Sequence, residues 1–218
     1  MTSLDREYKL TKLIKKGQAT LADEFIELAK WIASTYDIEI LNFIHDTIEN
    51  TSRPRLQLIF EFEKDAEKIR SVYGFGTTKQ LRMSATFIKL ISERLQKHKA
   101  DNNWIVITSF EQPAKEEARW AISKNEIEIL ESKLKLRELW KIYPGMNYSP
   151  TFFFFTNEQV QHFSSNGMKE YFAKKYFEIL KCHDEFGYYQ ENDFTIELES
   201  KENFESHYEN SWFNYDRR

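Results

Sequence analysis

The chain is poor in the residues that build disulfides, sharp turns and membrane spans. Its 218 residues include one cysteine, six glycines and four prolines. A single cysteine excludes an internal disulfide and a cysteine-rich zinc site, and so few glycines and prolines predict helices and strands with short connections. No window approaches the roughly 20 apolar residues of a membrane helix, and the charged residues 5–7 do not fit a secretory signal. We therefore expect a cytoplasmic protein without a membrane partner.

The chain also lacks an excess of basic residues. Lys and Arg number 31 and Asp and Glu number 35, which gives a formal net charge of −4. Proteins that coat nucleic acid usually need a positive surface to neutralise phosphates, so this balance argues against a nucleic-acid partner. The chain is rich in apolar residues (41%) and aromatic residues (16%), which is enough to bury a substantial core.

Apolar spacing in the first third predicts two helices and a hairpin. The pattern over residues 3–16 predicts a first helix that Gly17 ends, and Thr20 with Asp23 resembles a capping box for a second. Residues 38–48 are rich in β-branched and aromatic side chains, and residues 56–63 alternate with the period of a strand. The turn-forming residues between these two segments favour an antiparallel hairpin.

The middle of the chain predicts helix, strand and helix. Residues 79–99 carry the strongest helical stripe, and Trp104–Ile107 is a continuous apolar run typical of a central strand. Pro113 suits the first turn of another helix, and we expect helix over much of 114–143, ended by Pro144 and Gly145. Trp31, Trp104, Trp120 and Trp140 lie beside apolar neighbours, which predicts core positions for all four rings.

The last third predicts a strand, two helices, a strand and a short helical tail. Phe152–Phe155 has the composition of a buried strand, and Thr156 with Gln159 forms a capping box directly after it. Gly167 separates the two helices, and the alternation over residues 194–199 predicts a half-buried strand with Ser200 as the next helix cap.

Together these elements predict an α+β (mixed α/β) fold, with an N-terminal helical pair and one sheet of about five to six strands flanked by helices. Strand-to-helix junctions recur near residues 63, 111, 156 and 200, but the segments share no residue pattern, so the sequence predicts no repeat. We expect a single globular domain over residues 1–218, with 144–150 as a weak possible boundary.

The segment from Phe186 to Arg218 carries the most distinctive pattern. It interleaves aromatic rings with carboxylates, and only Lys201, Arg217 and Arg218 offset the acid. Rings give large, stiff contact surfaces and carboxylates attract cations, so the segment favours docking onto a basic protein partner. The predicted partner-binding residues are Glu197, Glu199, Glu202, Glu205, Glu209, Tyr208, Trp212 and Tyr215. A tail folded into the core is the competing interpretation, and we expect Trp212 partly buried and Tyr215 exposed.

Signals of catalysis are weak along the whole sequence. The five histidines lack metal-binding spacing, and residues 74–78 lack the lysine of a phosphate-binding loop. Cys182 and His183 are adjacent on a predicted helix and point about 100° apart, which favours a helix end with a small buried cysteine over a nucleophile and its base. We predict no catalytic residue, metal site or cofactor.

One alternative site resembles the Asp…Glu-x-Lys arrangement of metal-dependent nucleases. Asp184 or Asp193, followed by Glu199 and Lys201, would hold Mg²⁺ and position the attacking water. The same tripeptide form, Glu131–Lys133, also occurs on a predicted helix, so the pattern has little specificity.

The sequence therefore favours a non-catalytic protein-binding domain over an enzyme. An immunity-type inhibitor of a basic toxin or nuclease has this acidic, aromatic character. The alternatives are a metal-dependent nuclease-like enzyme with a site assembled by the fold, and a structural subunit of a larger assembly. The sequence predicts neither the identity of the partner nor the homo-oligomeric state.

Overall fold

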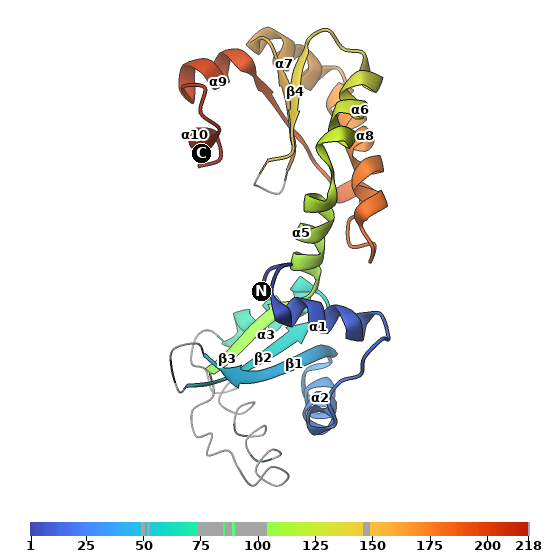
Figure 1. Cartoon of the computed structure of the whole chain (residues 1–218), viewed down its shortest axis with the longest axis vertical. Helices are drawn as coiled ribbons and strands as arrows, with labels where there is room; N and C mark the ends of the chain where they lie inside the picture. The colour runs from blue at the N-terminus through green and yellow to red at the C-terminus, as the bar shows by residue number, and fades with distance from the viewer. Residues whose placement is uncertain are drawn as a thin grey trace. The chain divides into compact units, whose positions relative to one another are not determined.

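The computed structural model describes residues 1–48, 51, 53–73, 85, 89, 104–145 and 149–217. Their contacts divide the chain into two compact units, Met1–Glu116 and Glu117–Arg218. Each unit has a three-stranded sheet of its own among the described residues (Figure 1). The mixed α+β class is therefore confirmed, but the expectation of one sheet of five to six strands is wrong. Residues 144–150 lie inside the second unit, and independent folding of 1–218 as one domain stays a prediction.

Unit 1 comprises a helical pair, a hairpin, a helix, a strand and the start of a further helix. The sheet order is β1-β2-β3, with β1 antiparallel and β3 parallel to β2. The predicted hairpin is confirmed, whereas Trp104–Ile107 lies in an outer strand of the described sheet and not a central one. The elements are α1 (Arg6–Lys15), α2 (Asp23–Tyr36), β1 (Ile40–Thr47), β2 (Pro54–Phe60), α3 (Glu63–Tyr73), β3 (Trp104–Ser109) and α5 (Glu111–Ala121), whose last residues belong to unit 2.

Local signals around the first helices are only partly confirmed. Gly17 takes a positive φ of 68° just after α1, as expected of a residue that ends a helix. The residue before α2 is Ala22, which has no capping side chain, so the predicted capping role of Thr20 is wrong. The helix expected over residues 79–99 lies almost entirely outside the described residues.

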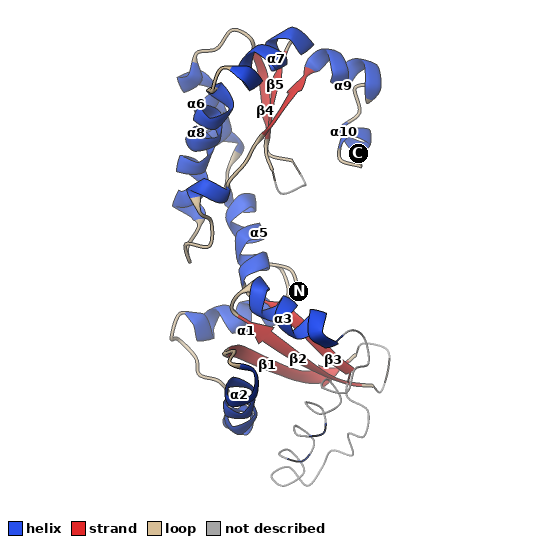
Figure 2. Cartoon of the chain, turned by 180° about the vertical axis from the view of Figure 1, so that it is seen from behind, coloured by secondary structure: helices blue, strands red, loops and turns tan. Residues whose placement is uncertain are grey.

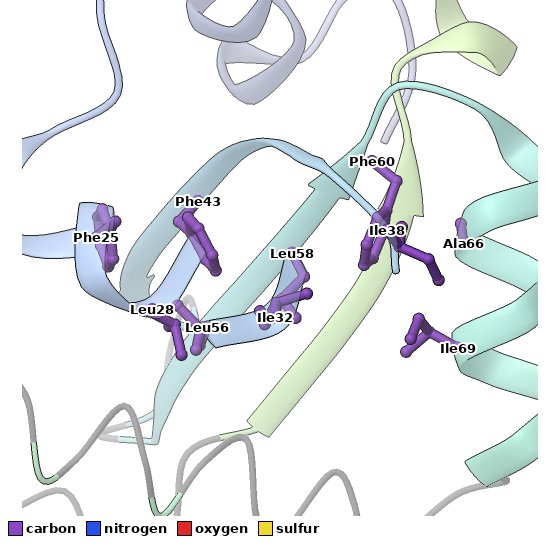
Figure 3. Close-up of a cluster of buried hydrophobic side chains, with 10 residues drawn as sticks. All are labelled: Phe25, Leu28, Ile32, Ile38, Phe43, Leu56, Leu58, Phe60, Ala66 and Ile69. Atoms are coloured by element: carbon purple, nitrogen blue, oxygen red, sulfur yellow. The ribbon is translucent and has the colours of Figure 1, made fainter. Parts of the chain in front are cut away.

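The core of unit 1 forms because alternate strand residues and one helical stripe are apolar. Phe25, Leu28 and Ile32 of α2 pack against the sheet, and Ala66 and Ile69 of α3 join the same cluster (Figure 3). On the opposite face of the sheet lies α1, whose Tyr8 ring stacks on Phe110 with centroids 5.0 Å apart. Both faces of this sheet are thus covered.

Unit 2 has a second mixed sheet of order β4-β5-β6. The expectation of helix up to residue 143 is wrong. The helix α6 ends where Lys135 takes a left-handed φ of 52°, and β4 then pairs with β5. The capping box at Thr156 and the cap at Ser200 are confirmed. The elements are α6 (Lys124–Leu134), β4 (Leu139–Tyr143), β5 (Thr151–Phe154), α7 (Asn157–Ser165), α8 (Met168–His183), the 3₁₀ turn η1 (Glu191–Asp193), β6 (Glu197–Ser200), α9 (Lys201–His207) and α10 (Trp212–Tyr215).

The phenylalanines of β5 point alternately to the two faces of this sheet. Phe152 and Phe154 join the cluster that packs against α6, α7 and α8, and Phe153 points to the opposite face, where α9 and α10 lie (Figure 2). All three rings are buried, which confirms the predicted buried strand for Phe152–Phe154, but Phe155 follows the strand and is 41% exposed, so the prediction is wrong for that ring.

The two units repeat one arrangement that the sequence does not reveal. Among the described residues, each has a hairpin, then helix (α3 in unit 1, α7 and α8 in unit 2), then a strand parallel to the second hairpin strand, and then a further helix. Each hairpin also has a register shift directly after its first residue pair. In unit 1 that pair is Ile40 with Phe60, and in unit 2 it is Leu139 with Phe154. The third strand ends at Ser109 in one unit and Ser200 in the other, each opposite the last residue of the central strand.

Candidate functional site: the surface of α9 and α10

The C-terminal helices lie against β5 because short polar side chains cap each turn. Ser200 accepts a hydrogen bond from the backbone N–H of Asn203 (2.9 Å), and Ser211 accepts one from Asn214 (3.3 Å). Between the helices, Glu209 and Asn210 both have positive φ angles, 54° and 58°, so the chain reverses there. This turn brings α10 onto the face of the sheet that carries Phe153.

The rings of α10 complete a buried aromatic cluster. Tyr215 is 2% exposed, and its hydroxyl donates to Thr151 Oγ1 on β5 (3.2 Å). The expectation that Tyr215 is exposed is therefore wrong, because Phe153 needs a cover and Tyr215 provides it. Trp212 is half-buried, as expected, and lies between Tyr143 and Phe204, with ring centroids 4.2 and 4.3 Å away.

Two phenol groups of the cluster, those of Tyr143 and Tyr215, are held in their neutral form. Burial, followed by a hydrogen bond to Asp216, raises the pKa of Tyr143 to about 12, and burial raises the pKa of Tyr215 above its ordinary value. The Tyr143 hydroxyl donates to Asp216 Oδ2 (2.8 Å). Both tyrosines thus remain hydrogen-bond donors that hold α10 in place at neutral pH.

Cationic side chains border the same cluster. Lys141 Nζ lies 4.8 Å from the centre of the Trp212 ring, and Lys201 Nζ lies 5.5 Å from that of Trp140. At the outer surface the Arg217 guanidinium lies 3.9 Å from the ring of Phe213, which is 62% exposed. Phe213 is therefore the most exposed ring of α10.

The predicted acidic residues differ in their roles. Glu197, Glu205 and Glu209 are exposed, and Glu205 forms an ion pair with Lys201 (3.3 Å). The Glu202 carboxylate is exposed too, but it accepts a hydrogen bond from the backbone N–H of Asn157 at the start of α7 (2.9 Å). Glu202 therefore connects two elements of the fold, so its charge cannot be reversed without a cost in stability.

The residues of the nuclease alternative each bind other groups. The half-buried Glu199 accepts from Asn203 Nδ2 (3.1 Å), Lys201 lies between Trp140 and Glu205, and Asp184 accepts from the backbone N–H of Tyr189 (2.8 Å). Within the described part of the chain, no three His, Cys, Asp or Glu side chains are grouped so that they could hold a metal ion. The nuclease alternative gains no support from these contacts and stays a prediction.

Both units close the carboxyl end of their parallel strands with the same hydrogen bonds. Ser200 Oγ donates to Asn157 Oδ1 (2.6 Å), and in unit 1 Ser109 Oγ donates to Glu63 Oε2. The backbone N–H of Glu63 donates to Glu111 Oε2 (2.9 Å). In unit 2 the backbone N–H of Asn157 donates to Glu202 Oε2 in the same way. Strand ends of this kind bind ligands in many α/β proteins, but here each is closed by side chains of the chain itself.

Another polar contact connects α6 to the end of α8. Glu126 completes the capping box of α6 with Ser123, and its Oε1 lies 2.8 Å from His183 Nε2. The hydrogen bond from the Ser123 backbone N–H, with smaller contributions from the Ser123 hydroxyl and His183, lowers the pKa of Glu126 to about 2. Cys182 is exposed, so the expectation of a buried cysteine is wrong, although α8 does end at His183 as predicted.

Sequence reasoning missed two exposed tryptophans. Trp104 is 40% and Trp120 is 59% exposed, so the expectation of core positions is wrong for these two rings. Each has an arginine nearby: the Arg53 guanidinium lies 4.6 Å from the Trp104 ring, and Arg119 precedes Trp120. Only Trp120, which follows Arg119 near the end of α5, had such a neighbour in the sequence, because Arg53 and Trp104 are brought together by the fold.

Comparisons with protein-family models, with curated proteins and with solved structures give no match to this chain. No helix in the described residues is both long enough and apolar enough to cross a membrane.

Proposed function

We propose that this chain is a non-catalytic protein-binding domain that docks a basic protein through the surface of α9 and α10. The observation that supports this best is Phe213, an exposed ring on a helix whose neighbouring rings, Trp212 and Tyr215, are packed into the fold. An exposed ring on a rigid base loses little conformational entropy on binding and is typical of an interface hot spot.

The exposed carboxylates of the C-terminal segment favour a basic partner, although Arg217 itself lies over the Phe213 ring. Glu205 and Glu209 are exposed on the same helix–turn segment, and Glu197 is exposed at the start of β6. Carboxylates at the rim of an interface raise the rate of association with a positively charged protein more than they raise the final affinity. Inhibition of a basic toxin or nuclease, as by an immunity protein, is the use we propose for such a surface.

The contacts divide the predicted binding residues into two groups. Glu197, Glu205, Glu209 and the half-buried Tyr208 and Trp212 would meet the partner around Phe213. Glu199, Glu202 and Tyr215 would support the surface from within, because their hydrogen bonds join elements of the same unit.

The test begins with affinity capture from the native host and continues with the purified partner. Phe213→Ala should weaken binding by about 2 kcal/mol, roughly 30-fold, with little change in stability, as hot-spot truncations do. The double variant Glu205→Lys with Glu209→Lys should slow association and flatten its dependence on salt. Surface plasmon resonance at several salt concentrations measures both effects.

The matched control is Glu39→Lys, which reverses an exposed acid of unit 1 and should leave association unchanged. An unchanged affinity in Phe213→Ala, or a captured partner with an acidic binding surface, would contradict the proposal.

A further inference from the structure

A small pocket in unit 2 shares no residue with the surface of α9 and α10. Its volume is about 160 Å³, and it is formed by the end of α5, the segments on either side of the β4–β5 connection, α8 and Phe194. The residues that matter chemically are Arg119, Trp120, Pro144, Pro150, Tyr176 and Phe194.

One end of the pocket is polar and fixed in position. Arg119 Nη1 donates to the hydroxyl of Tyr189 (3.2 Å), and the backbone N–H of Tyr189 in turn donates to Asp184 Oδ2 just after α8 (2.8 Å). A guanidinium carries five N–H donors in a planar fork, so it can serve several acceptors and matches the two oxygens of a carboxylate.

The remaining walls are flat and apolar. The rings of Tyr176 and Phe194 stack with centroids 6.0 Å apart and planes 12° apart, and Tyr176 is so deeply buried that its pKa is raised. Pro144 and Pro150 add rigid walls, and the exposed Trp120 lines the pocket as well. Such walls favour a planar, apolar ligand that can stack on them.

The size of the pocket limits the ligand to about one ring. An apolar cavity of about 150 Å³ is large enough to hold benzene, and the volume here is about 160 Å³. Arg119 is the one cationic residue of the described lining, and the flat apolar walls suit an aromatic carboxylate better than inorganic phosphate, which has no ring to place against them. We propose that this pocket binds a small aromatic monocarboxylate, with the carboxylate on Arg119 and the ring against the aromatic and proline walls.

Titration of the full chain with benzoate tests this proposal. Saturable shifts are expected in the backbone amide resonances of Gly145 and Tyr189, which belong to the pocket or support it. Benzamide, which keeps the ring but lacks the charge, and cyclohexanecarboxylate, which keeps the charge but lacks the planar ring, should each bind at least tenfold more weakly. Inorganic phosphate should produce no saturable shift.

The variants Arg119→Met and Trp120→Ala should each raise the benzoate Kd at least tenfold. Arg137→Met, which removes an exposed arginine of unit 2 outside the pocket, is the matched control and should bind benzoate as the unchanged chain does. Trp120→Ala decides the question if Arg119→Met fails to fold, because the Trp120 ring is largely exposed. Absence of saturation, equal affinity for benzamide, or full benzoate binding by a folded Arg119→Met chain would overturn the proposal. Phe213→Ala should leave benzoate binding unchanged, which separates this result from the test of protein binding.

Discussion

The two units use the same strand arrangement but cover the second face of their sheets from opposite ends of the chain. In unit 1 this face meets α1, which precedes the hairpin, and hydrogen bonds join the two beside the Tyr8–Phe110 stack: Asn42 donates to Thr11, and Gln57 donates to Glu7. In unit 2 it meets α9 and α10, which follow the last strand, and the contacts are mainly aromatic. One topology therefore tolerates two unrelated covers.

Equivalent sheet positions contact the cover in both units. Gln57 pairs with Ile44, and Thr151 pairs with Tyr143. Ile44 lies four residues after Ile40, and Tyr143 lies four residues after Leu139, the residues at which the two paired regions begin. Gln57 is bonded to α1, and Thr151 is bonded to Tyr215 of α10. The sheet therefore determines where a covering segment must attach, while the covering segment determines which chemical groups the outer surface presents.

The largest expected effect comes from removing the ring that holds each cover in place. Tyr8→Ala in unit 1 and Tyr215→Ala in unit 2 should each cost about 3–5 kcal/mol of unfolding free energy, as large-to-small changes in a core do. Phe213→Ala, on the exposed side of α10, should change it by less than about 0.5 kcal/mol.

Hydrogen exchange of the β2 and β5 amides reads the two units separately. Equal, negligible losses from Tyr8→Ala and Tyr215→Ala would show that the covers are not part of the folded units, and the comparison would fail.

A smaller effect is expected from the strand ends. Glu111→Ala removes the carboxylate that accepts from the backbone N–H of Glu63 at the start of α3. Glu202→Ala removes the one that accepts from the backbone N–H of Asn157 at the start of α7. Each change should cost about 1–2 kcal/mol, the range of a lost helix cap. Glu205→Ala, which breaks only an exposed ion pair, should cost less than about 0.5 kcal/mol.

Denaturant titrations measure these three losses. If Glu202→Ala matched Glu205→Ala, the strand-end bond of unit 2 would contribute nothing, and the correspondence between the two strand ends would be geometric only.

A still smaller effect on stability is expected from lowering the pH. The folded pKa of Glu126, about 2, lies below the ordinary value of 4.5, so its contribution to stability is present above pH 4.5 and is lost as the pH falls toward 2. Because the side chain is partly solvated, that contribution should stay below about 1 kcal/mol.

Thermal melts between pH 2 and pH 6 test the assignment. The loss of stability on acidification should be smaller in Glu126→Gln than in the unchanged chain, whereas Glu209→Gln should follow the unchanged chain. Identical curves for all three would show that Glu126 is not responsible.

No effect is expected from divalent metals. Millimolar Mg²⁺ or Mn²⁺ should leave the Tm unchanged and should not support cleavage of DNA or RNA, because Glu199 and Lys201 bind other side chains. A metal-dependent rise in Tm that disappears in Glu199→Gln would restore the nuclease alternative. A rise lost only in Glu63→Gln would place a metal at the strand end of unit 1.

Most elements could be predicted from the sequence because their signals are local. The capping box at Thr156, the cap at Ser200 and the buried strand residues Phe152–Phe154 each depend on residues within one turn or one strand. The strand β4 was missed because Leu139–Tyr143 is short and follows a helix, and its pairing with β5 is what makes it a strand.

The division into two sheets could not be predicted because strand pairing is not local. The repeat was hidden for a related reason: the two units keep hydrogen bonds at equivalent positions while exchanging residue types, as where Glu63 corresponds to Asn157. In the candidate surface, the aromatic and acidic composition was readable, but the burial of Tyr215 and the bond from Asn157 to Glu202 depend on residues 64 and 45 positions apart.

The register shift shared by the two hairpins has a consequence for aggregation. Each shift is a β-bulge that leaves one extra residue, Leu41 or Trp140, in a strand that lies at the edge of its described sheet. A flat edge strand offers a row of unpaired backbone groups to the edge of another molecule, and a bulge bends and twists that row out of register. The bulges of β1 and β4 thus disfavour edge-to-edge addition of further copies at these two edges.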